Sequence, residues 1–215
     1  MNRIEKEIKK IKDGYEDELF YFKSKKNLIQ LIPVKISQDN IKLITKWRKE
    51  NWDAFLTKFE VTENNTKLWL ENICKDTERI LFSIYVNNKN IGHIGIYKYN
   101  KKYQSVNIDS VLKGIQIPEK DLMKKVLDIL FTWIFEKMNL KLVQLEVFTD
   151  NFKAINLYER AGMVTKNSVP IKKIKTEDGW IWRKTKLTKN KTGERYLNLM
   201  EITKNDYFEI IQKNR

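Results

Sequence analysis

Apolar and polar residues alternate along one stretch of the chain and then change to a helical period. Over residues 142–149 every second residue is apolar and several are β-branched or aromatic, which predicts a strand. Asp150 or Asn151 can cap a helix that follows at once, and Gly162 supplies the left-handed residue that ends it. The pattern predicts a strand, a turn and a helix in direct succession, with the capped helix end open at a sheet edge.

The same patterns predict a mostly antiparallel sheet with helices packed on it. Asparagine-rich turns separate three strand segments between residues 80 and 112, which indicates a meander. A broad apolar stripe over residues 122–134 predicts a helix, and together with the strand at 142 it forms a right-handed β-α-β crossover. Further strands are expected at residues 28–34, 168–174 and 196–202, and further helices at 37–49, from Thr62 onward and at 206–215.

Three segments make up the predicted domain organisation. Residues 1–27 carry isoleucines at helical spacing and then aromatic residues, so we predict a helical and aromatic extension outside the main domain. The main domain is expected over residues 28–202, and a short helix over residues 203–215. The extension could pack on the domain or on a second copy of the chain, which leaves a homodimer open.

Composition narrows the class of protein. The chain has 215 residues, 41% hydrophobic and 12% aromatic, which suffices for one main core. No apolar run approaches the roughly 18 residues of a membrane span, and the charged N-terminal residues do not resemble a signal peptide, so we expect a cytoplasmic protein without membrane contact. Cys74 and His93 are the sole cysteine and histidine, which argues against disulfides and multi-histidine metal sites. No metal is predicted.

The formal net charge is +14, and two interpretations are open. The charge could serve a phosphate-rich partner, or it could reflect many solvated lysines. The lysines are scattered rather than grouped in blocks, which favours solvated lysines over a nucleic-acid partner. A basic surface would still attract small phosphorylated ligands.

The segment at 150–163 reads Asp-Asn-x-x-Ala-x-x-Leu-Tyr-Glu-x-x-Gly-Met. It closely resembles the late motif of the GNAT N-acetyltransferases, which move acetyl from acetyl-coenzyme A (acetyl-CoA) to an amine. The resemblance implies the GNAT fold, an α/β (α+β) fold whose mostly antiparallel, twisted central sheet is splayed at strands 4 and 5 and flanked by helices. It also implies that Asn151, Ala154 and Asn156 line the path of the cofactor, and that the Tyr158 hydroxyl protonates the departing thiolate. A phenol of pKa about 10 can do so when the thiol has a pKa of about 8.5. The alternative is an ordinary β-α unit in which Tyr158 is a core aromatic residue.

The pyrophosphate loop upstream departs from the family pattern. The resemblance implies that the cofactor is held by Val111, Leu112, Lys113, Gly114 and Lys120. The loop nevertheless lacks the family's Gly-x-Gly/Ala element, and Pro118 removes a backbone amide. Glu119 and Asp121 place negative charge where the resemblance puts a pyrophosphate, at a helix N-terminus.

The acceptor side resembles one branch of the family. Ile44-x-x-Trp47-Arg48 is similar to a motif of the ribosomal-protein and sugar-amine acetyltransferases. The resemblance implies an acceptor pocket walled by Arg48, Trp52, Phe55 and Phe59. Equally, the aromatic residues could be core residues and Arg48 could be solvated.

Acetyl transfer needs a base and donors for the developing oxyanion. Asp109 and His93 are the two candidates for the base, since both lie on strands expected to face the site. His93 could instead be a hydrogen-bonded strand residue, and Asp109 could bind the substrate ammonium or a hydroxyl. The resemblance implies that the backbone amides near Val111 and Leu112 are the oxyanion donors.

The chain combines the motifs Ile-x-x-Trp-Arg, Gly-His-Ile-Gly, Ile-Asp-x-Val-Leu and Val-Phe-Thr-Asp-Asn with the segment from Phe59 to Trp69. This combination is similar to bacterial and viral acetyltransferases that modify amino groups on nucleotide-linked deoxysugars for surface polysaccharide. We therefore expect the acceptor to be the amine of a nucleotide-activated amino-dideoxy sugar, attacked directly in a ternary complex with acetyl-CoA. Two alternatives are an amine of a ribosomal or other protein, and a non-catalytic RNA-binding module on the same fold.

Overall fold

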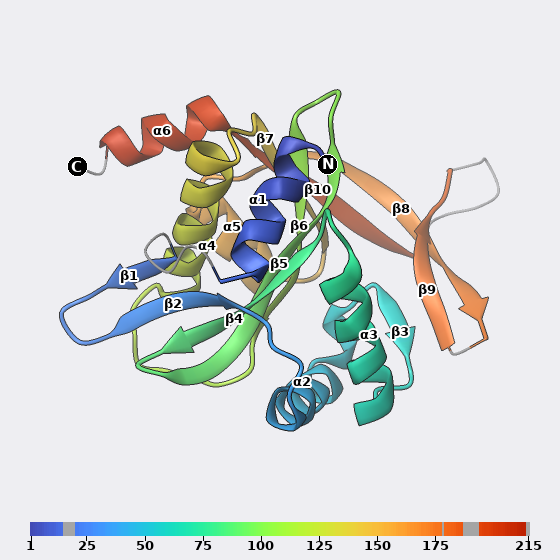
Figure 1. Cartoon of the computed structure of the whole chain (residues 1–215). Helices are drawn as coiled ribbons and strands as arrows, with labels where there is room; N and C mark the ends of the chain where they lie inside the picture. Colours follow the sequence, from blue (N-terminus) through green and yellow to red (C-terminus); the bar gives the residue numbers. More distant parts are fainter. Residues whose placement is uncertain (15–19, 178, 187–193, 214–215) are drawn as a thin grey trace.

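The structure is a computed structural model that describes residues 1–14, 20–177, 179–186 and 194–213. Within these residues the strands form one mixed sheet of ten strands (Figure 1). The strand order is β1-β2-β4-β5-β6-β7-β10-β8-β9-β3. The strands are β1 (Tyr21–Lys23), β2 (Leu28–Pro33), β3 (Thr57–Phe59), β4 (Ile80–Val86), β5 (Lys89–Asn100), β6 (Ser105–Lys113), β7 (Leu142–Phe148), β8 (Val164–Thr176), β9 (Gly179–Lys184) and β10 (Arg195–Thr203).

The helices are α1 (Arg3–Lys12), α2 (Gln38–Glu50), α3 (Glu63–Lys75), α4 (Leu122–Thr132), α5 (Phe152–Arg160) and α6 (Lys204–Lys213), with a 3₁₀ turn at Trp52–Ala54 and a π-helical turn at Trp133–Lys137. Four of the six described α-helices, α1, α2, α3 and α5, begin at a residue whose side chain caps them, whereas Asp121 before α4 makes no capping hydrogen bond. Ser37, Thr62 and Asn151 each accept a backbone N–H of the first helical turn. The predicted helix starts at these three residues are therefore confirmed, and of the two candidates Asn151 rather than Asp150 caps α5.

The sheet separates two main cores of unequal size, and a third, smaller cluster joins Phe148, Ile171 and Leu197 of β7, β8 and β10. The larger core gathers side chains from α1, α4 and α6, and Figure 1 shows α1 and α4 across the middle strands. The smaller core joins α2 and α3 to the opposite face through Trp47, Leu70, Leu81 and Leu112. A mostly antiparallel sheet flanked by helices is the predicted fold class, which is confirmed.

β6 and β7 are parallel neighbours that separate part-way along their length. Their paired residues run from Ser105 to Asn107 on β6 and from Leu142 to Gln144 on β7, although β6 continues to Lys113 and β7 to Phe148. Within the described residues the two strands therefore diverge beyond Asn107, as the predicted splay requires. We call the diverging ends, residues 108–113 and 145–148, the fork.

The N-terminal helix packs on the sheet. Ile4, Ile8 and Ile11 of α1 are buried in the larger core. The Lys12 ammonium donates to the carbonyl oxygens of Ile73, Cys74 and Asp76 at 3.0, 3.2 and 2.6 Å, where α3 ends. Packing on the domain is one of the two arrangements expected for residues 1–27; the boundary at residue 27 stays a prediction.

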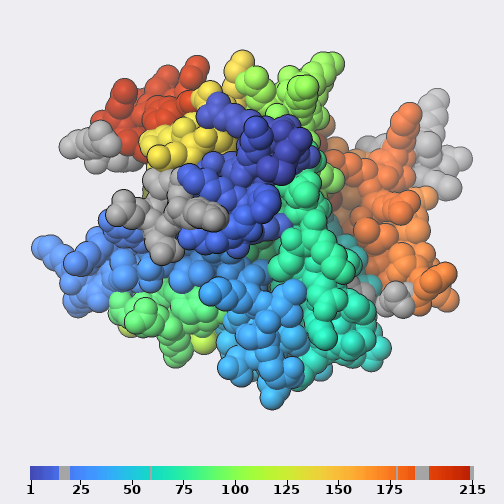
Figure 2. All heavy atoms as spheres, in the orientation of Figure 1, coloured from blue at the N-terminus to red at the C-terminus, as the bar shows by residue number. Residues whose placement is uncertain are grey.

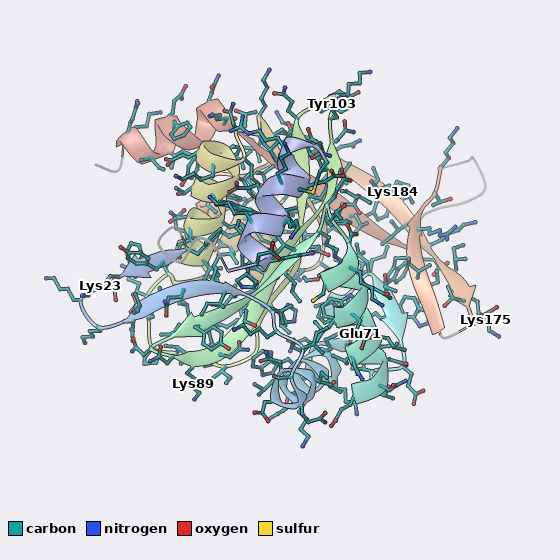
Figure 3. All side chains as sticks on the ribbon, viewed as in Figure 1. Lys23, Glu71, Lys89, Tyr103, Lys175 and Lys184 are labelled. Carbon is teal, nitrogen blue, oxygen red and sulfur yellow. The ribbon has the colours of Figure 1, made fainter. Side chains whose placement is uncertain are left out.

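β8 and β9 stand out from the body of the molecule, on the right in Figures 1 and 2, and β3 lies beside α3 in Figure 1; we call these three strands the arm. β3 was not predicted, and it pairs antiparallel with β9 from Thr57 to Phe59. The arm carries many of the basic side chains, including Lys175 and Lys184, while Lys23 and Lys89 project from distant strands (Figure 3). The scatter of these lysines agrees with the distribution expected from the sequence. Among the described helices, none combines the length and the apolar composition that a membrane crossing requires.

Candidate active site

A cavity of about 430 Å³ fills the fork. Its walls come from the two diverging strands, from the start of α5, and from the segment that follows α2. Seven of the residues expected at the site line it: Arg48, Phe55, Asp109, Val111, Asn151, Ala154 and Tyr158. The structure thus brings together residues from the acceptor motif, from β6 and from the 150–163 motif.

A bulge shapes the β6 side of the cavity. Gly95 pairs with Asp109 and His93 with Leu112, so that Ser110 and Val111 together oppose one residue of β5. Ser110 has φ of 53°, which is unusual for a residue other than glycine. In a regular strand, residues three positions apart such as Ile108 and Val111 point to opposite faces of the sheet. Here both side chains contact the larger core, because the bulge adds one residue between them.

Asp109 is ion-paired at the edge of the cavity. Its Oδ2 accepts from Arg79 Nη2 at 2.6 Å, and within the described residues its buried Oδ1 has no hydrogen-bond partner. Burial raises the pKa of the Asp109 carboxyl, whereas Arg79 opposes that rise. Asp109 therefore lines the cavity with a buried carboxylate whose charge is balanced by Arg79.

The start of α5 forms the opposite wall. The Asn151 side chain accepts the Ala154 N–H at 3.2 Å, and both residues line the cavity. Tyr158 is 7% exposed and lines the cavity one helical turn farther on. Burial raises the pKa of the Tyr158 hydroxyl well above its usual range, so the phenol stays protonated at neutral pH. Asn156, also expected to hold the cofactor, is exposed and is absent from the described lining.

His93 lies behind the cavity wall. Its side chain is completely buried, with ring centroids 6.5 Å from Trp47 and 6.2 Å from Trp69, and it is not among the described residues that line the cavity. Nδ1 lies 2.6 Å from the carbonyl oxygen of Ser110. Burial lowers the pKa of His93 to about 4, because a charged imidazole would lose its hydration there. The geometry favours Asp109 over His93 as the group that meets the substrate.

The acceptor end combines a buried cation with aromatic rings. Arg48 is 5% exposed, and its guanidinium lies 4.3 Å from the centroid of Phe55 and 4.7 Å from that of Trp69. Burial lowers the pKa of Arg48 to about 10, which leaves it charged at neutral pH. The interpretation of Arg48 as a solvated residue is therefore wrong.

Two other residues expected at the acceptor pocket are not seen there. Trp52 is absent from the described lining, and its carbonyl oxygen accepts a hydrogen bond from Lys58. The backbone of Phe59 pairs with Gly179, but the Phe59 side chain lies outside the described part of the chain.

Five polar lining residues were not predicted from the sequence: Thr57, Arg79, Tyr97, Ser110 and Glu146. Glu146 extends from β7 and is ion-paired with Lys184 of the arm at 2.7 Å (Lys184 is labelled in Figure 3). Burial raises the pKa of Tyr97 to about 12, and the carboxylates of Glu146 and Asp109 add to the rise, which means that both lie near its hydroxyl. Gln144 and Glu146 are polar and alternate with the apolar Val143, Leu145 and Val147, and this alternation is the signal that could have identified Glu146.

The acidic residues of the loop before α4 are neutralised within the protein. Glu119 accepts from Lys125, Asn27 and Ser24, and these bonds lower the pKa of its carboxyl. Asp121 is ion-paired with Arg160. The two carboxylates thus oppose an anion less than the sequence suggested.

The other residues expected to hold the cofactor are spread along the same segment. Leu112 is buried against the smaller core, and Gly114 packs on the Trp47 ring, where an added Cβ would come within 2.2 Å. Lys113 is half-buried and Lys120 is exposed. Burial and the charge of Lys153 lower the pKa of Lys113, so two ammonium groups lie near each other beside the fork.

A sequence profile described as the acetyltransferase (GNAT) family matches residues 44–163, more than half of the chain. The chain belongs to the GNAT family. No curated protein sequence gives a significant match. Among solved structures, the spermidine N-acetyltransferase of Vibrio cholerae in complex with CoA and spermine superposes with a TM-score of 0.65 at 16% identity, covering 84% of this chain and 98% of that one. The spermidine/spermine N-acetyltransferase of the same organism, in complex with manganese ions, gives 0.61 at 14% identity, covering 85% and 96%.

GNAT enzymes use acetyl-CoA, and the fork suits this cosubstrate. Where β6 and β7 diverge, their backbone amides and carbonyls no longer hydrogen-bond to each other. The extended, amide-containing arm of CoA can form hydrogen bonds with such groups. Asn151 and Ala154, at the start of α5, line the same cavity. Within the described residues no group of three or more histidine, cysteine, aspartate or glutamate side chains could hold a metal ion.

Proposed function

We propose that this GNAT protein moves acetyl from acetyl-CoA to the primary amine of a nucleotide-activated amino-dideoxy sugar, by direct attack in a ternary complex. The observation that carries the proposal is the single cavity in the fork, which Asp109, Val111 and Tyr158 line together. A base, an amide donor and an acid around one space are the three groups that acyl transfer to an amine requires.

Each group has a defined task in this proposal. The Asp109 carboxylate binds the acceptor ammonium and takes its proton, so that the amine nitrogen can attack the acetyl carbonyl carbon. The Val111 N–H stabilises the charge that develops on the carbonyl oxygen. As the carbon–sulfur bond breaks, the Tyr158 hydroxyl gives its proton to the thiolate.

The charges around the acceptor end favour an amine that also carries an anionic group. Arg48 and Arg79 line the cavity, and each lining carboxylate already has a cation, Arg79 for Asp109 and Lys184 for Glu146. With a chain charge of +14, a polycation would approach against the field of the protein, whereas a diphosphate would approach with it. The rings of Phe55 and Trp69 offer apolar faces to a deoxysugar.

A polyamine is the second candidate, because the similar solved structures named above are spermidine N-acetyltransferases. Asp109 and Glu146 on opposite sides of the fork could receive two ammonium groups of one chain. This candidate requires both carboxylates to exchange a protein cation for a substrate cation.

The experiment is an acetyl-transfer assay with matched acceptors. A nucleoside-diphosphate amino-dideoxyhexose is compared with the same nucleotide sugar carrying a hydroxyl in place of the amine, with spermidine, and with a lysine-containing peptide. We expect turnover of the amino sugar nucleotide, with KM rising at higher salt, and none of the hydroxyl analogue. Faster turnover of spermidine would move the assignment to polyamines. The absence of any thermal shift with acetyl-CoA would contradict the enzymatic proposal as a whole.

A further inference from the structure

The bulge of β6 fits against a short segment of β5, Gly92-His93-Ile94-Gly95. A Cβ on Gly92 would stand 2.1 Å from the carbonyl oxygen of Leu112, and a Cβ on Gly95 would stand 2.8 Å from Asp109 Oδ1. Both approaches are too close for any side chain at these two positions. Because they lack a Cβ, Gly92 and Gly95 allow the two ends of the bulge, Leu112 and Asp109, to pack closely against β5. His93 lies between the two glycines.

His93 is tied to the centre of the bulge. A carbonyl oxygen can only accept, so the 2.6 Å contact requires Nδ1 to carry the proton and to donate it to the Ser110 oxygen. Nε2 is then an unprotonated acceptor, and within the described residues it has no partner. The ring is fully buried between Trp47 and Trp69, which leaves it little freedom to turn.

The bond explains how Ser110 keeps a left-handed backbone. A residue with a Cβ persists at φ of 53° where its surroundings hold it, and here the imidazole fixes its carbonyl group. Without the extra residue, β6 would continue its alternation, and Val111 would point to the opposite face of the sheet. The position of the Val111 backbone at the cavity thus depends on the bulge.

We propose that His93 is a positioning residue, whose Nδ1–H holds the Ser110 carbonyl so that the bulge presents the Val111 amide to the acetyl oxygen. The inference rests on the proposed acetyl transfer, and it gives His93 a task other than that of a base. His93 contacts no reacting atom. It acts through the backbone of β6.

The first test reads the imidazole directly and needs no turnover. His93 is the sole histidine of the chain, so a long-range ¹H–¹⁵N spectrum contains one imidazole pattern. We expect the neutral Nδ1–H tautomer, unchanged from about pH 5.5 to 8, because burial lowers the pKa of His93 to about 4. An Nε2–H tautomer, or titration near pH 6.5, would overturn the proposal whether or not the substrate has been identified.

The second test separates positioning from folding. His93→Leu removes the donor, His93→Asn keeps an N–H at similar reach, and Ile94→Val is the control for a change in the core of the same strand. We expect His93→Leu to lower kcat at least about 10-fold with little change in KM for acetyl-CoA, and His93→Asn to recover part of the loss. The acidic limb of the pH profile should stay in place in His93→Asn. Full kcat in His93→Leu would overturn the assignment, and loss of the acidic limb would return His93 to the role of base.

Discussion

The fork and the flanks of the sheet use charged side chains for different purposes. In the fork, Arg79 and Asp109 face a cavity and leave one carboxylate oxygen without a partner. On the flanks, Lys12 closes the end of α3, and Lys58 is 2% exposed beside the rings of Trp52 and Trp180 at 4.9 and 5.6 Å. Charge that faces a cavity can act on a substrate, whereas charge enclosed by protein groups can act only on stability. Substitutions in the two regions should therefore affect different measurements.

Tyr158→Phe gives the largest expected effect. Loss of the proton donor should lower kcat about 100-fold or more, since general acid catalysis contributes about 10² to 10⁴. The thermal midpoint and the affinity for acetyl-CoA should change little, because the ring remains. Steady-state kinetics and a thermal-shift titration with acetyl-CoA measure the two.

Tyr207→Phe is the matched control for this change. Tyr207 is also a buried tyrosine, but its hydroxyl bonds Thr132 at 2.7 Å in the larger core. Its loss should cost about 1 kcal/mol of stability and leave kcat unchanged. If Tyr158→Phe and Tyr207→Phe lose turnover equally, the effect of Tyr158→Phe cannot be assigned to a proton donor in the fork.

Arg79→Met should move the pH dependence of the reaction. Burial raises the pKa of Asp109 and Arg79 opposes that rise, so removal of Arg79 raises the pKa further. The ionised, active form of Asp109 is then reached at higher pH, and the acidic limb of kcat/KM should shift upward, with a loss of about 10-fold per pKa unit on that limb. Arg79→Lys keeps the charge and should shift the limb less. An unchanged limb in Arg79→Met would exclude Asp109 as the base.

The sequence predicted the 150–163 motif of the fork well because that motif is local. A strand, the Asn151 cap, a short helix and Gly162 all specify structure within a few residues of themselves, and φ of 93° at Gly162 agrees with its predicted role. A break in alternation also marks the bulge, since Val106 and Ile108 are followed by an apolar pair at 111–112 rather than by an apolar residue at 110.

Contacts between distant segments could not be predicted in the same way. Arg79 meets Asp109 because the β4–β5–β6 registers bring residues 30 positions apart together. Glu119 accepts a hydrogen bond from Asn27, 92 positions away in the turn between β1 and β2. β3 was missed because the buried Lys58 breaks the apolar alternation that would indicate a strand.

Lys12→Met tests the flank formed by α1. The ammonium donates to three carbonyl oxygens where α3 ends, and a methionine cannot replace those bonds. We expect a loss of about 1 kcal/mol, or about 2–4 °C in the thermal midpoint, with kcat unchanged. Lys10→Met, on the exposed side of α1, is the control and should differ from the wild type by less. A loss of turnover at a temperature where Lys12→Met is folded would show that α1 acts on the fork.

Lys58→Met should have the smallest effect at neutral pH and a characteristic pH dependence. Burial lowers the pKa of Lys58 from 10.5 to about 8, so the folded state disfavours the charged form. Between about pH 8 and 10.5 the unfolded state binds more protons than the folded state, and this group makes the wild type more stable as pH rises through that window. Below about pH 8 its contribution is constant. Urea unfolding at pH 7, 8, 9 and 10 should therefore show the wild type gaining on Lys58→Met only above pH 8, with the exposed Lys49→Met as control. If the difference in unfolding free energy between the wild type and Lys58→Met stays constant to pH 10, the Lys58 ammonium is hydrated in the folded state. The contrast between an enclosed charge on the arm and a cavity-facing charge in the fork would then fail.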